Sequence, residues 1–331
     1  MKKAILILSA STLMYFGITS FKDKYESYKG FSLKAFENSL AYIPKGSFHF
    51  GPSDEDIPYK VTYEFPSRTV SVDSFCMSKF EVCNGQYLEF LNELLKVDTN
   101  LYKSMLPDTL VWREKYSYNE PYVEYYLRHP AYGNYPVVGV NYEQAQSFCV
   151  WLTKKYMNEP KRKFKKVKFK LPKSEQWVFA AKGKLDLSPF PWKGIDMQNS
   201  KGELLANFLY VDQASIWRDS VYQKNFSSQF EKAQIYRVGG SQGYYYSSGF
   251  SKIKGNTGDV TMPVMSFQPN GYGLYNMAGN VEEFMREKGK THGGSWRDTG
   301  FYLLNDVFEN YDTLNSTSAQ RGFRFVMEFE K

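Results

Sequence analysis

From Leu171 to the C-terminus, the chain has few long runs of periodic apolar residues and is interrupted repeatedly by Gly, Pro, Asn and Trp. The chain is nevertheless rich in large rings, because 18% of its 331 residues are aromatic, including 27 Tyr and 26 Phe. Disordered chains lack such bulk, so we expect the long loops to be ordered. Loops of this length need internal anchors, and buried rings or bound ions are the usual ones. The sequence therefore predicts one domain with long ordered loops.

The N-terminus has the charge pattern of an export signal. Lys2 and Lys3 precede an almost uncharged apolar run at residues 4–21, the only run of that length in the chain. A cationic start followed by a short apolar centre is typical of a secretory signal peptide. We expect residues 1–20 to be a cleaved signal, and the mature chain to lie in the periplasm or to be associated with the outer membrane. An uncleaved anchor is the alternative, because such a run can just span a bilayer.

Three cysteines, Cys76, Cys83 and Cys149, limit the redox and metal chemistry available to the chain. None lies near the end of the signal, so the chain is not expected to be a lipoprotein. No CxxC or Cys/His pair has metal-ligand spacing, which argues against a structural zinc site. Buried free thiols are favoured, although the sequence leaves any disulfide among the three open.

Hydrophobic periodicity predicts a few regular elements. Alternation of apolar and polar residues predicts a short strand pair at 41–51 and a strand at 68–75. Apolar residues at helical spacing predict helices over 84–95 and 141–155, each capped by its first residue, an asparagine. Between the two helices, residues 107–135 form an irregular aromatic insert, whose rings either pack in the core or form an exposed interface.

Positive charge is concentrated in one short segment. The net charge of the chain is +7, and residues 154–170 contain nine Lys or Arg against one Glu. Alternation at 167–171 places lysines on the solvent side of a strand. The segment is either a lysine-rich edge that discourages strand pairing or a patch for an anionic partner, such as a phosphorylated glycan or an acidic protein surface. Nucleic acid is not expected as a partner, because no nucleic-acid fold signature is present.

Short motifs extend along most of the chain. They are AYIPKGSF at 41–48, KFEVCNGQY at 79–87, YPVVGV at 135–140, EQAQSFCVWL at 143–152, LPKSEQW at 171–177, FPW at 190–192, AN at 206–207, NGYGLYNMAGNVEEF at 270–284, GGSW at 293–296 and RGFR at 321–324. In this order they resemble the formylglycine-generating enzyme, or sulfatase-modifying factor, domain family. The resemblance implies an α+β, C-type-lectin-like fold with low regular secondary structure and long ordered loops. It implies a single domain over 40–331, after a lead-in at 21–39.

Further motifs lie in the insert and upstream of it. They are SDEDIP at 53–58, PDTLVWR at 107–113, YNEPY at 118–122 and HPAY at 129–132. They resemble motifs of a subgroup of the family, the gliding-motility lipoproteins K and J associated with type IX secretion, and they imply a subgroup insert at about 100–135. The chain departs from that subgroup because it lacks a lipid-modified cysteine after the signal and looks shorter.

The chemistry of the resembling family depends on two cysteines just after the Gly-Gly-Ser motif, which bind copper. The corresponding positions in this chain are Asp298 and Leu303. A carboxylate is a hard oxygen ligand that cannot replace a thiolate for Cu(I), and leucine cannot bind a metal. We therefore expect neither formylglycine-generating activity nor copper. A hydrolytic site that combines His292 with Ser295 or Asp298 would need an oriented base, which the sequence does not reveal.

The resemblance implies a calcium site instead. Asn276, Gly279, Val281 and Glu283 fall on calcium ligands of the family. An amide oxygen, two backbone carbonyls and a carboxylate within eight residues are hard donors of the kind that calcium prefers. The ion would be structural. The alternative is that Glu283 pairs with an arginine and that no ion is bound.

A second family calcium site would use Asn207 and the carbonyl of Phe208. Its acidic partner falls on Asn256, with Asp259 nearby. The asparagine makes this second site a weaker match to the family pattern than the first. Either ion would hold long loops in place rather than take part in a reaction.

Three functions remain open at this stage. The first is a non-catalytic exported scaffold or accessory component of the type IX secretion and gliding apparatus. Its partners would be envelope proteins, and it would touch the membrane only through them or through an uncleaved signal. The second is a glycan- or ligand-binding module of lectin-like fold. The third is an enzyme of unknown chemistry, which requires His292, Ser295 and Asp298 to converge in a pocket.

Overall fold

The computed structural model describes residues 28–51, 67–113, 118–210, 258, 260–311 and 316–330. The expected signal at 1–20, the motif at 53–58 and positions 256 and 259 lie outside the described residues. The helices are α2 (Leu33–Asn38), α3 (Asn84–Val97), α4 (Thr99–Ser104), α5 (Glu120–Tyr125), α6 (Tyr142–Met157) and α7 (Ser174–Lys182), with short 3-10 turns η3 (Thr109–Trp112), η4 (Pro130–Tyr132) and η6 (Gly300–Leu303).

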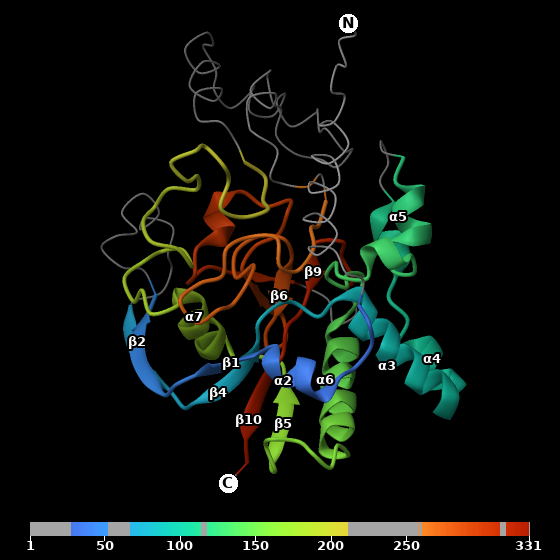
Figure 1. Ribbon diagram of the computed structural model, residues 1–331. Helices are drawn as coiled ribbons and strands as arrows, with labels where there is room; N and C mark the ends of the chain where they lie inside the picture. The colour runs from blue at the N-terminus through green and yellow to red at the C-terminus, as the bar shows by residue number, and fades with distance from the viewer. Residues whose placement is uncertain are drawn as a thin grey trace, which may run out of the picture.

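The strands are short and form three small sheets. They are β1 (Leu40–Ile43), β2 (Gly46–Phe50), β3 (Arg68–Val72), β4 (Phe75–Ser78), β5 (Val167–Lys170), β6 (Glu282–Phe284), β7 (Lys290–His292), β8 (Phe308–Asn310), β9 (Arg321–Gly322) and β10 (Val326–Phe329). One sheet has the order β1-β4-β10-β5, a second is β8-β7-β6-β9, and β2 pairs with β3 alone. The C-terminal strand therefore lies inside the first sheet, between β4 and β5 (Figure 1).

The strand pair predicted at 41–51 is wrong in its pairing. Both strands exist, but β1 pairs with β4 and β2 pairs with β3. The predicted strand at 68–75 is two strands, β3 and the start of β4. Alternation identifies a strand, but its partner is set by contacts with distant parts of the chain.

Helices α3 and α6 contribute to the largest cluster of buried apolar side chains. Phe90 of α3 and Phe148 of α6 meet edge to face at 5.7 Å, and both belong to this core. Asn141 caps α6 as predicted, since its Oδ1 accepts a hydrogen bond from the Gln144 N–H at 2.9 Å. The predicted cap of α3 is wrong, because Cys83 occupies the N-cap position and Asn84 is the first helical residue.

A second buried cluster packs α7 against β2, β3 and β4. Trp177, in the middle of α7, is fully buried and contributes to it. Cys76, Cys83 and Cys149 are buried free thiols, as the sequence analysis favours. No helix in the described part of the chain has the length and apolar character that crossing a bilayer requires.

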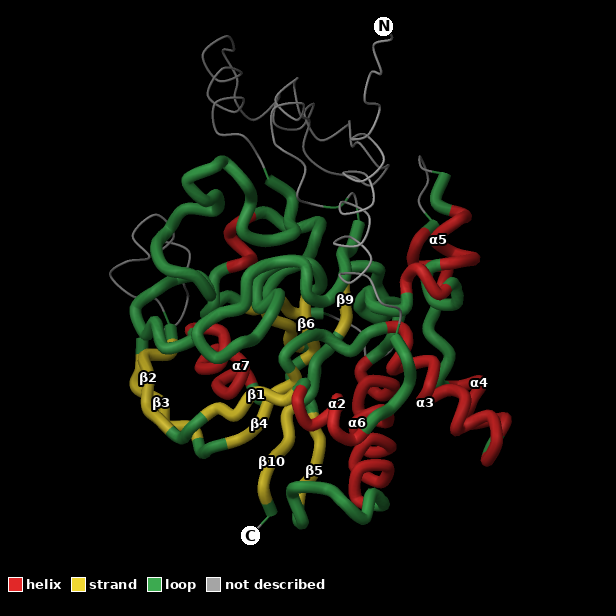
Figure 2. Tube along the Cα trace, viewed as in Figure 1, coloured by secondary structure: helices red, strands yellow, loops and turns green. Residues whose placement is uncertain are grey.

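Loops occupy most of the region around β6 and β9 (Figure 2). They are held by rings, as in the stacked pair of Phe190 and Trp192 at 5.0 Å. The molecule is thus an α+β domain with short strands and long ordered loops, and this confirms the predicted fold class.

Candidate functional site

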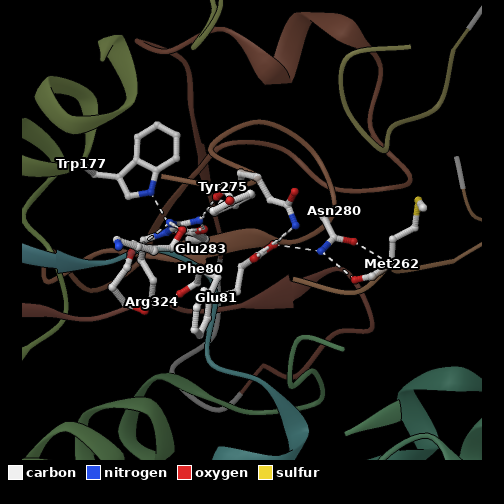
Figure 3. Close-up of polar contacts among 11 residues, drawn as sticks. Phe80, Glu81, Trp177, Met262, Tyr275, Asn280, Glu283 and Arg324 are labelled. Carbon is white, nitrogen blue, oxygen red and sulfur yellow. Dashed lines mark hydrogen bonds and ion pairs between the residues drawn. The ribbon is translucent and has the colours of Figure 1, made fainter. Parts of the chain in front are cut away.

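A buried carboxylate lies where three distant segments meet. Glu81 follows β4 and is completely buried. The Asn280 Nδ2 donates hydrogen bonds to Glu81 Oε1 at 2.9 Å and to the Met262 carbonyl at 3.1 Å (Figure 3). The Asn276 Nδ2 lies 3.2 and 3.3 Å from the two oxygens of Glu81. Two asparagine amides therefore support one carboxylate in the interior.

Asn276 and Asn280 have left-handed backbone conformations, with φ of 48° and 67°. Asparagine tolerates this region better than other non-glycine residues, because its short polar side chain can hydrogen-bond locally. These conformations accompany side chains that both contact Glu81. The local backbone of the NGYGLYNMAGN motif is thus coupled to the buried network.

An ion pair between Glu283 and Arg324 completes this network. Glu283 is 1% exposed and Arg324 is 0% exposed, and their Oε1 and Nη2 atoms are 2.6 Å apart. The Arg324 Nε donates to both carboxylate oxygens at 2.8 and 2.7 Å, and the Trp177 Nε1 donates to Oε2 at 2.7 Å (Figure 3). Both oxygens of Glu283 therefore have nitrogen partners, which compensates for the cost of burying its charge.

The network contains two carboxylates, Glu81 and Glu283, but only one guanidinium, that of Arg324. This excess of negative charge affects the pKa of Glu81. Burial raises the pKa of Glu81 from its ordinary value of 4.5 to about 7, Arg324 acts against this shift and Glu283 adds to it. Glu81 therefore changes its protonation state near neutral pH.

The predicted calcium ligands are only partly available in this arrangement. The Asn276 Oδ1 is buried and has no hydrogen-bond partner among the described residues, so it is free to bind a cation. The Glu283 carboxylate, in contrast, is already bound by Arg324 and Trp177. Gly279 has a φ of 73°, and a Cβ there would lie 2.4 Å from the Asn207 carbonyl oxygen, so this backbone contact requires glycine.

The residues of the second predicted calcium site lie against the first. The Asn280 N–H donates to the Asn207 carbonyl at 2.7 Å. The Asn207 side chain is used twice, since its Nδ2 donates to the Val260 carbonyl at 2.8 Å and its Oδ1 accepts from the Gly258 N–H at 3.1 Å. In the described residues, Asn207 thus acts as a structural link between two loops.

In the loop that follows the Gly-Gly-Ser motif, the side chains at both positions expected for the family's cysteines are held by contacts within the domain. The Asp298 Oδ2 accepts hydrogen bonds from the Ser295 N–H at 2.7 Å and from the Ser295 Oγ at 2.5 Å. Leu303 is 0% exposed and packs in an apolar cluster with Phe190 and Leu204. One position is therefore held by a local turn and the other by the core.

The enzyme alternative requires His292, Ser295 and Asp298 to converge, and the structure brings together only Ser295 and Asp298. His292 is buried on β7 with its ring stacked on Trp177 at 5.1 Å, and neither of its ring nitrogens is hydrogen-bonded to Ser295 or Asp298. Burial lowers the pKa of His292 to about 3. A neutral imidazole held against a tryptophan cannot act as a base for Ser295.

The insert packs directly on this loop. Trp112 of the insert stacks on Trp296, the residue after Ser295, with ring centroids 6.3 Å apart, and contacts Tyr126 at 4.7 Å. The Asn84 Nδ2 donates to the carbonyls of Tyr126 and Tyr132 at 2.9 and 3.0 Å, which fastens the insert to α3. This role of Asn84 does not follow from the sequence pattern, because helix-cap patterns describe only local contacts.

One cavity of about 480 Å³ opens beside the buried network. Its wall includes Trp192, Glu203, Gln268, Asn270 and Asn276. His292, Ser295 and Asp298 do not line it. The cavity combines an aromatic ring with amide and carboxylate groups.

Together, the small sheets, the long ring-anchored loops and the buried polar network define a domain of the formylglycine-generating-enzyme type. Residues 33–329 match the family described as "Sulfatase-modifying factor enzyme 1-like domain", and the chain belongs to this family.

Relatives of this chain carry names of both active and inactive proteins. The mouse "Formylglycine-generating enzyme" is 27% identical over 325 residues, which covers 85% of this chain and 73% of the mouse protein. The bovine "Inactive C-alpha-formylglycine-generating enzyme 2" is 25% identical over 322 residues, covering 86% and 87%.

Two solved structures support the fold. PvdO from Pseudomonas aeruginosa has a TM-score of 0.54 at 18% identity, covering 88% of this chain and 94% of PvdO. CarF has a TM-score of 0.51 at 18% identity, covering 88% and 98%.

Proposed function

We propose that this chain is a non-catalytic, exported scaffold or accessory component of the type IX secretion and gliding-motility apparatus. The observation that carries the non-catalytic part is the state of positions 298 and 303. A carboxylate bound to Ser295 and a fully buried leucine stand where the family chemistry requires thiolates.

The cysteines elsewhere in the chain offer no substitute. Cys76, Cys83 and Cys149 are buried, and burial raises the pKa of the Cys76 and Cys83 thiols to about 11. Copper chemistry and nucleophilic catalysis both need the thiolate. The proposal therefore includes neither copper nor oxidation of a substrate cysteine, and it agrees with the existence of relatives that are named inactive.

The insert supports the scaffold part of the proposal. Its inner side is buried against Trp296 and α3, whereas Leu110, Tyr118 and Tyr125 are 53%, 84% and 46% exposed. Aromatic and apolar side chains on an ordered surface suit protein interfaces, because such side chains bury a large area at low entropic cost. Three of the four motifs that resemble gliding-motility proteins, at 107–113, 118–122 and 129–132, lie in this same insert.

Surface substitutions test the scaffold better than deletion of the insert, because deletion would expose the buried contacts of Trp112. The variant carries Leu110→Ser, Tyr118→Ser and Tyr125→Ser, and a matched control carries Tyr42→Ser, Leu187→Ser and Ile195→Ser, three exposed apolar residues elsewhere. Each full-length protein is tagged, mildly cross-linked in its native envelope and purified, and co-purifying proteins are identified by mass spectrometry.

We expect the wild type and the control to recover secretion or motility components in a fixed ratio, and the insert variant to lose at least about tenfold of that yield, in line with one interface hot spot. Thermal melts should show all three proteins folded. Two results would contradict the scaffold proposal. One is wild-type protein that is purified without any secretion or motility component. The other is an insert variant that recovers as much of these components as the wild type does.

A glycan-binding function is the alternative, and the cavity beside Trp192 favours it. A tryptophan ring with nearby carboxylate and amide groups can stack on a sugar and bind its hydroxyls. Binding of a neutral oligosaccharide that Trp192→Ala abolishes would favour this alternative. Loss of partner recovery in the insert variant alone would favour the scaffold.

We also propose that the chain binds a structural calcium ion through Asn276, Gly279, Val281 and Glu283, with Glu283 exchanging a contact with Arg324 or Trp177 for the ion. The unpartnered Asn276 Oδ1 supports this site. A ligand at about a hundred times its Kd stabilises a fold by about 2.7 kcal/mol, so a calcium chelator should lower the melting temperature by several degrees. Magnesium-loaded protein is the control. An unchanged melt, with no calcium found by elemental analysis, would contradict the site.

A further inference from the structure

The connection between α6 and β5, together with the end of α6 and with β5, accounts for the excess of positive over negative charge in the chain. Residues 154–170 contain nine Lys or Arg and one Glu, whereas the whole chain has a net charge of +7. In Figure 1 this connection lies at the lower end of the molecule, beside the C-terminal end of β10 and far from α5. We call residues 158–166, with the end of α6 and Phe329, the basic tip.

The lysines of this segment divide into two groups. Three of them pair with carboxylates: Lys155 with Glu89 and Glu93, Lys168 with Glu330, and Lys170 with Glu328. The remaining five are exposed, and none forms an ion pair with any residue that the structure describes: Lys154, Lys161, Lys163, Lys165 and Lys166. The excess charge is therefore not neutralised within the described part of the molecule.

The backbone of the basic tip is held in place. The Glu37 Oε1 accepts hydrogen bonds from the Lys163 N–H and from the Tyr156 hydroxyl, both at 2.7 Å. The Phe164 N–H donates to the same Tyr156 oxygen at 3.2 Å. A tip fixed at its centre presents its lysines without a further cost of ordering the backbone.

Two aromatic rings lie among the lysines. Phe164 is half-buried and meets Phe329 with ring centroids 5.6 Å apart, and Phe329 is 39% exposed. The Lys163 ammonium lies over the Phe164 ring at 5.2 Å. Partly exposed rings beside lysines suit the interface between lipid headgroups and acyl chains, where an apolar body and a charged end are both accommodated.

We propose that the basic tip docks the domain directly on an anionic lipid bilayer. The tip is a protruding turn, and the cavity described above is lined by other residues, so it suits a broad charged surface rather than one bound molecule. Its exposed cations are mainly lysines, which act as point charges and do not need the bidentate geometry of an arginine site. Clusters of four to eight basic residues near a membrane surface bind anionic lipids in this way. This contact is independent of the insert and of the N-terminal apolar run.

Vesicle co-sedimentation of the full-length chain tests the proposal. The vesicles are pure phosphatidylcholine, or phosphatidylcholine with phosphatidylglycerol as the anionic lipid. The tip variant carries Lys→Gln at 161, 163, 165 and 166. The matched control carries Lys→Gln at 45, 96, 103 and 201, four exposed lysines elsewhere, and so has the same net charge and the same N-terminus.

We expect the wild type and the control to bind anionic vesicles more tightly than neutral ones, and the preference to fall as salt increases. Each lysine near an anionic surface changes the binding constant about fivefold, so the tip variant should lose roughly a hundredfold or more of that preference. Equal losses in the tip variant and the control, or a wild type without preference for anionic vesicles, would overturn the proposal. A tip variant that still binds vesicles but loses an acidic protein partner would also overturn it.

Discussion

The family resemblance assigns a calcium site and the two cysteine positions to two neighbouring loops of this domain, and these loops differ in how they are built. Residues 276–283 contain both side chains that the resemblance assigns to calcium, Asn276 and Glu283, and these are bound to Glu81 and Arg324. In residues 295–303, a serine–aspartate turn and a packed leucine stand at the positions that the resemblance assigns to the two cysteines. The first loop is therefore a charged part of the core, whereas the second is an ordinary turn that ends in an apolar cluster.

The difference teaches that a motif can be retained because the fold depends on it, whether or not the site takes part in a reaction. Removing Glu283 would leave the completely buried Arg324 without its counter-charge, which is a large penalty. Replacing Asp298 removes the acceptor of the Ser295 hydrogen bonds on a partly exposed turn. Substitutions in the two loops should therefore have very different effects on stability.

The largest effect is expected for Arg324→Met. The variant leaves Glu283 buried with only its Trp177 partner, so the free energy of unfolding should fall by about 3–5 kcal/mol, the usual range for breaking a buried pair. Urea denaturation measures this change. Arg68→Met is the control, because the Arg68–Glu175 pair is 3.4 Å long and largely exposed, and its loss should cost less than about 1 kcal/mol. Equal losses in the two variants would remove the distinction between the loops.

A pH-dependent effect of intermediate size is expected for Glu81→Gln. Since the pKa of Glu81 is about 7 in the folded state and 4.5 ordinarily, the folded protein holds a proton that the unfolded chain has released. The contribution of Glu81 to the free energy of unfolding is therefore fully present below about pH 4.5. It is lost as the pH rises towards 7, and the total loss is about 3 kcal/mol. Glutamine cannot ionise, so the stability of the variant relative to wild type should rise by about 2–3 kcal/mol between pH 5 and pH 7.5.

Urea denaturation at several pH values checks this expectation. His292, with its pKa lowered to about 3, makes both proteins gain stability as the pH rises from 3 to 6.5, so only the difference between them reports on Glu81. Glu143→Gln, at an exposed carboxylate, serves as the control and should run parallel to wild type. A parallel profile for Glu81→Gln would show that its carboxyl is not perturbed.

The sequence predicted the local helices and strands and the motifs of the family, but not which strands pair with each other. Helical spacing and the Asn141 cap identified α6, because both signals come from residues within one or two turns. The same reasoning found strands at 41–51 and paired them wrongly, because β4 and β3 come from later in the chain. Pairing depends on the whole core rather than on the local pattern.

For the same reason, only part of the candidate site could be predicted from the sequence. Asn276 and Glu283 follow from the motif, but Glu81 looks like an isolated carboxylate until the fold brings it to Asn276, 195 residues away. One signal was present, since Glu81 lies between Phe80 and Val82 in an otherwise apolar stretch. A charge at such a position is buried only with partners, so it indicates a network without naming its members.

The smallest effect is expected for Asp298→Ala. The substitution removes the acceptor for the Ser295 N–H and Oγ, and Ser295 is completely buried. An unsatisfied buried donor costs about 1–3 kcal/mol, and the partial exposure of the loop at Asp298 places the expected loss near the lower end of that range. Asp298→Asn, which keeps an acceptor oxygen, should lose less, so urea denaturation of the pair separates the hydrogen bonds from the charge. A loss as large as that of Arg324→Met would mean that this turn is as essential to the core as the buried network, and the contrast between the two loops would no longer hold.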